Sequence, residues 1–176
     1  MADTCTLIST VSVGVGGAAS IDFTSIPQTY TDLLLVFSLR GDANGAGGIR
    51  ATNEWKFNSS SSGYTSRWLY GIPGIVSSSA TSTETYAYGG YFNSSSATAN
   101  AFGSGQMYIP NYTGSQYKTW SIDGVSESHD TSTGLSLGTG VWSNSSAITS
   151  ITLLGDYASG NMAQYSTASL YGIKKS

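Results

Sequence analysis

Glutamate and lysine, the residues that most often cover the exposed faces of helices, occur only seven times among the 176 residues of this sequence. The chain has instead 32 Ser, 20 Thr and 22 Gly, together with Tyr, Val, Ile and Trp, which suit a half-buried pleated surface. A chain of this length buries roughly 70% of the surface that it exposes when unfolded, so one core holds it without disulfides or metals. We therefore expect an all-β protein with a single domain over residues 1–176.

Short apolar segments recur every 10 to 20 residues, separated by clusters of Gly, Ser and Asn. This spacing is typical of antiparallel sandwiches and barrels. In the strongest segment, 32–40, Leu35 and Phe37 are expected to face the core of a central strand. Residues 1–15 are expected to form an edge strand or an N-terminal arm, and 71–83 a loop. The pattern predicts about ten strands, at 5–15, 20–23, 32–40, 49–57, 64–70, 85–92, 97–109, 117–123, 147–154 and 162–173, and a short piece that begins at Val141.

The charge balance argues against several classes of partner. The net charge is −3 and the isoelectric point is near 4.8, whereas a protein that binds nucleic-acid phosphates needs a basic face. No apolar run approaches the roughly 18 residues of a membrane-spanning helix, and residues 1–4 lack the features of a signal peptide. The single cysteine, Cys5, excludes an intrachain disulfide. The sequence predicts a soluble, non-secreted protein that binds neither nucleic acid nor membranes.

Residues that support catalysis are few. The single histidine, His129, is followed by Asp130 in a polar stretch that is interpreted as an exposed turn. One His and one Cys cannot supply the ligands of a usual zinc site, and the acidic turn at 42–45 lacks those of a calcium loop. Of the ten acidic residues, Glu54 alone lies inside a predicted strand, without a second carboxylate to complete a glycosidase pair. We therefore predict no catalytic, metal-binding or cofactor-binding residues, and a protein that is not an enzyme.

The chain is rich in aromatic residues, with twelve Tyr and four Trp. Tyr86, Tyr88, Tyr91 and Phe92 lie close together in the sequence, around a pair of glycines. Because Tyr is enriched at interfaces, these four residues are candidates for contact with another subunit, and the tyrosines also suit stacking on sugar rings. The simpler alternative is cross-strand packing within the sheet, worth roughly 0.2 to 1 kcal/mol for each pair.

Six stretches carry a family resemblance through their order and spacing over residues 20–174. They are 23–33, 57–58 with Tyr64 downstream, 118–121, 142–153, 162–167 and 169–174. Together they resemble a group of small proteins encoded by tailed bacteriophages, many of them marine. The stretches from 162 onward are the most specific. The chain departs from the family at 59–63, Ser-Ser-Ser-Ser-Gly, where relatives tend to carry Gly-Asp.

The resemblance implies a virion structural protein with a jelly-roll-like β-sandwich. On this basis we expect a capsid decoration (cement) protein that stabilises the particle by binding copies of itself and the major capsid protein. Strand edges with few charges favour self-association, and a homotrimer is the expected state. The alternative is a receptor- or glycan-binding module of a tail fibre or surface appendage, with a host-surface glycan as its partner. A carbohydrate-active enzyme is a third hypothesis.

Overall fold

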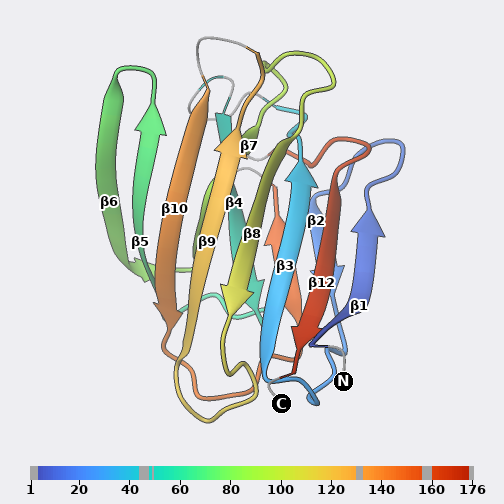
Figure 1. Cartoon of the computed structure of the whole chain (residues 1–176), viewed down its shortest axis with the longest axis vertical. Coiled ribbons are helices and arrows are strands. Elements are labelled where there is room, and N and C mark those ends of the chain that lie inside the picture. Colours follow the sequence, from blue (N-terminus) through green and yellow to red (C-terminus); the bar gives the residue numbers. More distant parts are fainter. Residues whose placement is uncertain (1–3, 44–47, 49, 130–132, 156–159, 175–176) are drawn as a thin grey trace.

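The described residues form twelve β-strands and no helix (Figure 1). The computed structural model describes residues 4–43, 48, 50–129, 133–155 and 160–174. Its strands lie in two antiparallel sheets that face each other, which confirms the predicted single-domain antiparallel β-sandwich. The strands are β1 (Cys5–Ser12), β2 (Ser20–Phe23), β3 (Asp32–Leu39), β4 (Arg50–Phe57), β5 (Tyr64–Ile72), β6 (Ile75–Glu84), β7 (Ala87–Asn93), β8 (Gly103–Ile109), β9 (Lys118–Ser126), β10 (Gly134–Trp142), β11 (Ile151–Leu154) and β12 (Thr167–Ile173).

Eight of these strands form two layers with the connectivity of a jelly roll. One layer has the order β1-β12-β3-β8, and the other has the order β2-β11-β4-β7. The chain alternates between the layers from β1 to β4 and again from β7 to β8 and from β11 to β12, as in a double Greek key. The hairpin β5–β6 follows β4, and the hairpin β9–β10 follows β8. Both hairpins join the first layer beyond β8, which gives a large sheet of eight strands that faces a small sheet of four.

Two strands lie where the sequence pattern indicated no complete strand. The prediction of a loop over 71–83 was wrong, because Pro73 begins a two-residue turn and β6 follows it directly. The second strand, β10, begins at Gly134, whereas the sequence pattern indicated only a short piece from Val141. The described residues therefore contain twelve strands instead of about ten.

Three predicted strands begin several residues later than expected, and β1 ends at Ser12 instead of residue 15. β8 begins at Gly103 instead of residue 97, because four backbone carbonyl groups between residues 95 and 101 accept hydrogen bonds from the Arg40 guanidinium at 2.9 to 3.1 Å. These carbonyl groups are used to hold a loop and not to pair with a neighbouring strand. β11 begins at Ile151 and β12 at Thr167, later than the apolar pattern indicated.

The space between the sheets is filled by aliphatic side chains and an aromatic cluster. Leu35 and Phe37 on β3 are 0% and 3% exposed, which confirms their predicted place in the core. The ring centroid of Phe57 lies 5.7 Å from that of Trp120 and 5.8 Å from that of Trp142. Both pairs meet edge to face, the geometry that aromatic rings prefer in protein cores.

Tyr64 brings a polar group into this cluster. Its ring stacks on Trp142 with the planes 14° apart, and its hydroxyl oxygen accepts a hydrogen bond from the backbone N–H of Phe57 at 2.9 Å. Burial raises the pKa of the Tyr64 hydroxyl to about 12. The hydroxyl group therefore links β5 to β4 across the two sheets.

Glycines allow the small sheet to approach the large sheet closely along β7. A Cβ atom placed on Gly124 of β9 would lie only 2.7 Å from the backbone of Gly90 on β7. Two backbone N–H groups of β7 donate hydrogen bonds to the large sheet, one to Ser66 Oγ at 3.2 Å and one to Ser136 Oγ at 3.0 Å. The edge of β7 is therefore sealed, in the sense that serine side chains on the inner face of the large sheet accept hydrogen bonds from its backbone.

The described beginning and end of the chain lie side by side (Figure 1). β1 is an outer strand of the large sheet and pairs with β12, which pairs on its other side with β3. Beyond the strands, the backbone N–H of Lys174 donates to the carbonyl oxygen of Thr4 at 3.2 Å. Closing this side of the sandwich thus requires both the first and the last strand.

Candidate interaction surface

The inserted hairpins carry the large sheet past the last strand of the small sheet. That last strand is β7, which packs against β9 and β10. β6 lies at the far end of the large sheet, and none of its ten residues is buried. Figure 1 shows the β5–β6 hairpin projecting at this end. The outward face of the two hairpins is therefore a surface that the core does not use.

β10 reverses the usual pattern of a sandwich strand. From Gly134 to Gly140 its inward positions hold three glycines and a serine, and Trp142 enters the core only at the end of the strand, whereas Leu135 and Leu137 face outward and are 53% and 56% exposed. The bulk of the neighbouring strand explains the reversal, because a Cβ atom on Gly140 would collide with the ring of Trp120. Along this part of β10 the core is filled from β9, so Leu135 and Leu137 remain outside.

Five exposed apolar side chains gather on the outward face of the hairpins. We call this group the outer patch: Leu69, Val76, Val125, Leu135 and Leu137. In the ladders, Leu137 is directly opposite Leu69, and Leu135 is directly opposite Val125. Their exposed fractions range from 39% for Val125 to 88% for Val76. A contiguous apolar group of this kind marks an interaction surface, unlike single apolar residues scattered over a protein.

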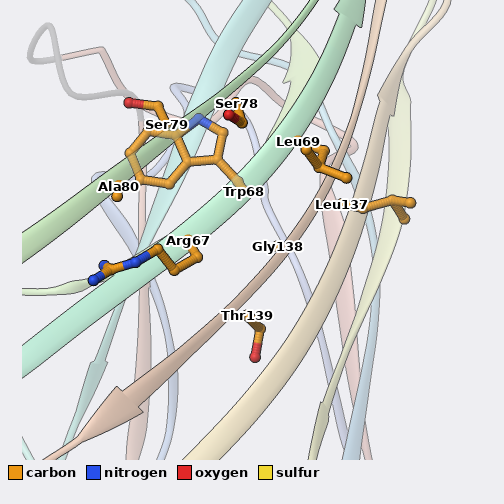
Figure 2. A pocket seen from close by; sticks show the side chains of 9 residues that line it. All are labelled: Arg67, Trp68, Leu69, Ser78, Ser79, Ala80, Leu137, Gly138 and Thr139. Carbon is orange, nitrogen blue, oxygen red and sulfur yellow. The ribbon is translucent and has the colours of Figure 1, made fainter.

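The outer patch is hollowed. An open hollow of about 580 Å³ lies along Leu69 and Leu137 and extends to Arg67, Ala80 and Thr139 (Figure 2). Two further hollows, of about 320 and 260 Å³, open over β8 and β9 and beside the β5–β6 turn. Because the hollows are open, they suit protruding side chains of a protein partner better than an enclosed small molecule.

Charged groups are sparse around the outer patch. The Arg67 guanidinium donates hydrogen bonds from Nη1 to the backbone carbonyl oxygens of Ser66 at 2.9 Å and Thr81 at 2.8 Å, which fixes it to the β5–β6 hairpin. Asp123 lies directly opposite Leu137 on β9 and faces the same way. With these charges beside five apolar side chains, the surface suits a partner that is bound mainly through apolar contact.

The aromatic residues that the sequence indicated for an interface lie in different settings. Phe92 is 0% exposed and contributes to the core, so it does not fit the predicted role at an interface. Tyr88 stacks on Trp68 of β5, with the ring centroids 4.1 Å apart and the planes at 10°. Tyr91 meets Tyr70 edge to face at 6.3 Å. These pairs fill the corner between β7 and the large sheet.

The three tyrosine candidates, Tyr86, Tyr88 and Tyr91, are partly exposed. Tyr86 lies just before β7. The Arg50 guanidinium lies 5.8 Å from the centre of the Tyr91 ring. Burial raises the pKa of the Tyr91 hydroxyl above its ordinary value. Contact of Tyr86, Tyr88 and Tyr91 with another subunit stays a prediction.

The histidine considered for catalysis is exposed, just beyond β9. His129 has a φ of 55°, and Glu127 Oε1 accepts hydrogen bonds from the backbone N–H groups of His129 at 2.9 Å and Ser128 at 3.0 Å. The carboxylate thus closes a turn, while Asp130 lies outside the described residues. Over the described part of the chain, no group of three or more His, Cys, Asp or Glu side chains is placed to hold a metal ion.

The side chains of Arg40 and Asp42 are both committed to loop contacts. Arg40 holds the 95–101 loop as described above, and burial lowers the pKa of its guanidinium. Asp42 Oδ1 accepts a hydrogen bond from the backbone N–H of Asn161 at 2.7 Å. These contacts support a structural role for the turn at 42–45, of which residues 44 and 45 lie outside the described residues.

One buried charge was not recognised as such from the sequence. Lys118 is 1% exposed, and its Nζ donates to the backbone carbonyl oxygens of Gly114 at 2.7 Å and Gln116 at 2.6 Å. Burial lowers the pKa of the Lys118 ammonium group. Its role is to fasten the β8–β9 loop to the end of the sandwich.

Comparisons with known proteins do not assign the chain to a family. No family model matches the chain, and a search of curated proteins found no match. Nowhere in the described ranges is there a helix of the length and apolarity needed to cross a membrane. The functional argument therefore depends on the residues and surfaces of the chain itself.

Proposed function

We propose that this protein is a non-enzymatic structural component of a virion, and that it acts as a capsid decoration protein. The observation that carries the proposal is the outer patch, an apolar surface that the jelly roll does not need for its own stability. A decoration protein needs a rigid framework and a surface that binds the particle. The sealed sandwich meets the first need, and the inserted hairpins meet the second. The family resemblance over residues 20–174 supports the virion setting.

The dimensions of this surface favour binding in many copies. Four strands of about eight residues present a face of roughly 19 Å by 26 Å, which is about 500 Å². A standard interface uses about 800 Å² of each partner, so one copy on its own is expected to bind weakly. Association between neighbouring copies raises the effective concentration of each binding surface and compensates for this weakness. The proposal therefore includes a homo-oligomer on the capsid surface.

The test removes the apolar contact without disturbing the fold. Leu137→Lys places a charge at the centre of the outer patch, opposite Asp123, where a lysine finds a favourable neighbour. The matched control is Val15→Lys, because Val15 is 88% exposed and lies outside the two sheets. Each protein is added to purified particles that lack it, and the bound copies are counted after sedimentation.

Wild-type protein and Val15→Lys should saturate the particles at hundreds of copies, while Leu137→Lys should bind at least tenfold more weakly. Location of the protein on the capsid in a particle reconstruction would agree with this result. Equal binding of Leu137→Lys and Val15→Lys would show that the outer patch does not contact the capsid. A handful of copies, all located at the tail, would reject the decoration role.

A second candidate function is a glycan-binding module of a tail fibre. It is favoured by the partly exposed rings of Trp68, Tyr70 and Tyr88 along the corner beside β7. Titration with host-surface glycans should then change the tryptophan fluorescence, and Trp68→Ala should abolish the change. The existing stack of Trp68 on Tyr88 uses one face of each ring, which leaves less aromatic surface for a sugar.

A further inference from the structure

The outer edge of β6 pairs with none of the described strands. β6 is the last strand in the order of the large sheet and pairs with β5 alone among the described strands. Residues 75–81 follow a regular register with 66–72, and the irregularity lies beyond them, toward Glu84. In an antiparallel ladder, alternate residues turn their N–H and C=O groups away from the partner strand. One side of this regular segment is therefore a template for another strand.

Features that normally protect an edge strand are missing from β6. Between Ile75 and Thr83 there is no charged residue and no proline. The other outer strands differ: β1 is interrupted by an irregularity between Leu7 and Ser9, and β2 has only four residues, one of them Asp22. The edge of β7 is sealed by serine side chains of the large sheet. β6 is thus the longest regular edge that the described chain leaves open.

We infer that β6 pairs with β6 of a second copy of this chain, antiparallel and about a two-fold axis at Ser78. In this register Ser78 faces Ser78, and Val76 faces Ala80 of the second copy on the outward face. On the other face Ser77 meets Ser79. At the ends of the segment Ile75 meets Thr81. Every pair joins uncharged side chains, so the strand is complementary to itself. The pairing also covers part of the Val76 side chain, which is 88% exposed.

The two-fold axis is perpendicular to the sheet, so the outer patches of both copies lie on the same face of the combined sheet. Two large sheets become one sheet, and two neighbouring patches form one longer apolar surface. The result is a closed dimer, because a two-fold contact uses the same edge on both copies and leaves neither free. This arrangement differs from the trimer that the sequence favoured.

The size of the contact sets its strength. Seven residues span about 23 Å, and with a depth of about 10 Å each copy buries roughly 230 Å², below the roughly 600 Å² per partner of a stable interface. We therefore expect a weak dimer in solution that is reinforced where a capsid holds copies close together. The inference rests on the self-association part of the proposed function and not on the virion location.

The test places charges on the axis. Ser78→Lys brings two ammonium groups together in the dimer, and Ser78→Glu brings two carboxylates together. The control, Ser121→Lys, carries the same charge on the outward face of β9, away from any edge. Sedimentation equilibrium is run on each protein at up to about 500 µM, a range that resolves weak dimers.

Wild-type protein and Ser121→Lys should approach twice 18.3 kDa at the highest concentration, and each Ser78 variant should stay a monomer with an unchanged melting temperature. An equimolar mixture of Ser78→Lys and Ser78→Glu should restore the dimer, at least tenfold more tightly than either alone. A wild-type monomer or trimer, a dimer unaffected by Ser78→Lys, or a mixture that stays monomeric would overturn the inference. Capsid binding by the outer patch is measured separately, so its failure is distinguishable from failure of the β6 contact.

Discussion

Replacing Gly124 with Ala tests the closest approach between the two sheets. The new Cβ atom would lie 2.7 Å from Gly90 Cα and at the same distance from the backbone N and O atoms of Tyr91. Carbon atoms in contact prefer about 3.5 to 4.0 Å, so β7 and β9 would have to separate by roughly 1 Å. The atoms in the way are backbone and cannot rotate aside. The sealed edge of β7 would therefore be displaced as a whole.

Overpacking of a core destabilises by about 1 to 3 kcal/mol, and a clash with backbone belongs at the upper end. We expect Gly124→Ala to lower the free energy of unfolding by about 3 kcal/mol, which for a chain of this size lowers the melting temperature by about 6 to 12 °C. Urea unfolding followed by tryptophan fluorescence measures the change, since Trp120 lies on the same strand.

The matched control is Gly14→Ala. A Cβ atom on Gly14 meets nothing within 4 Å, and its φ is not in the left-handed region. This variant should be neutral or gain up to about 1 kcal/mol, because alanine restricts the unfolded chain. If Gly124→Ala is destabilised by less than about 1 kcal/mol relative to this control, the sheets are not in backbone contact at β7, and the explanation for the glycines is refuted.

Three further predictions concern the core, the alkaline limit and one loop. Phe37→Ala should lower the free energy of unfolding by about 3 to 5 kcal/mol in urea titrations, and a loss below about 1 kcal/mol would exclude a core position. The native state keeps the Tyr64 proton between pH 10 and 12 while the unfolded chain loses it, so stability should fall as pH rises through this interval, and less steeply in Tyr64→Phe. Arg40→Lys should accelerate hydrogen exchange of the backbone amides in residues 95–101 and lower the free energy of unfolding by about 1 to 3 kcal/mol, because an ammonium group cannot donate to all four carbonyl groups. Unchanged exchange would contradict this role of Arg40.

The sequence was sufficient to predict strands that follow the usual rules. In β3, Leu35 and Phe37 alternate with more exposed residues, and the structure buries both. On β9, Trp120 and Ile122 face inward as their spacing indicates. Alternation identifies such strands because burial of one face is what stabilises them.

The missed strands break that rule for physical reasons. β6 has no alternation because neither of its faces is covered, so its ten residues resemble a serine-rich loop. On β10 the glycines face the core, and Leu135 and Leu137 face solvent. An alternating pair of leucines normally predicts a core position, so the outer patch was not found. A signal was present in the sequence: glycine recurs at alternate positions from 134 to 140 apart from Ser136, and leaves the leucines as the larger face.

The position of β12 between β1 and β3 has a consequence for synthesis on the ribosome. Translation produces β1 before the other eleven strands, yet the strand that pairs with it consists of residues 167–173. At 5 to 20 residues per second, the 155 positions from Ser12 to Thr167 take roughly 8 to 30 s to make. Throughout that interval β1 is without its native neighbour, and so is one side of β3 once Leu39 has been made. Nascent chains on adjacent ribosomes therefore display open strands to one another until the last strand of each has emerged.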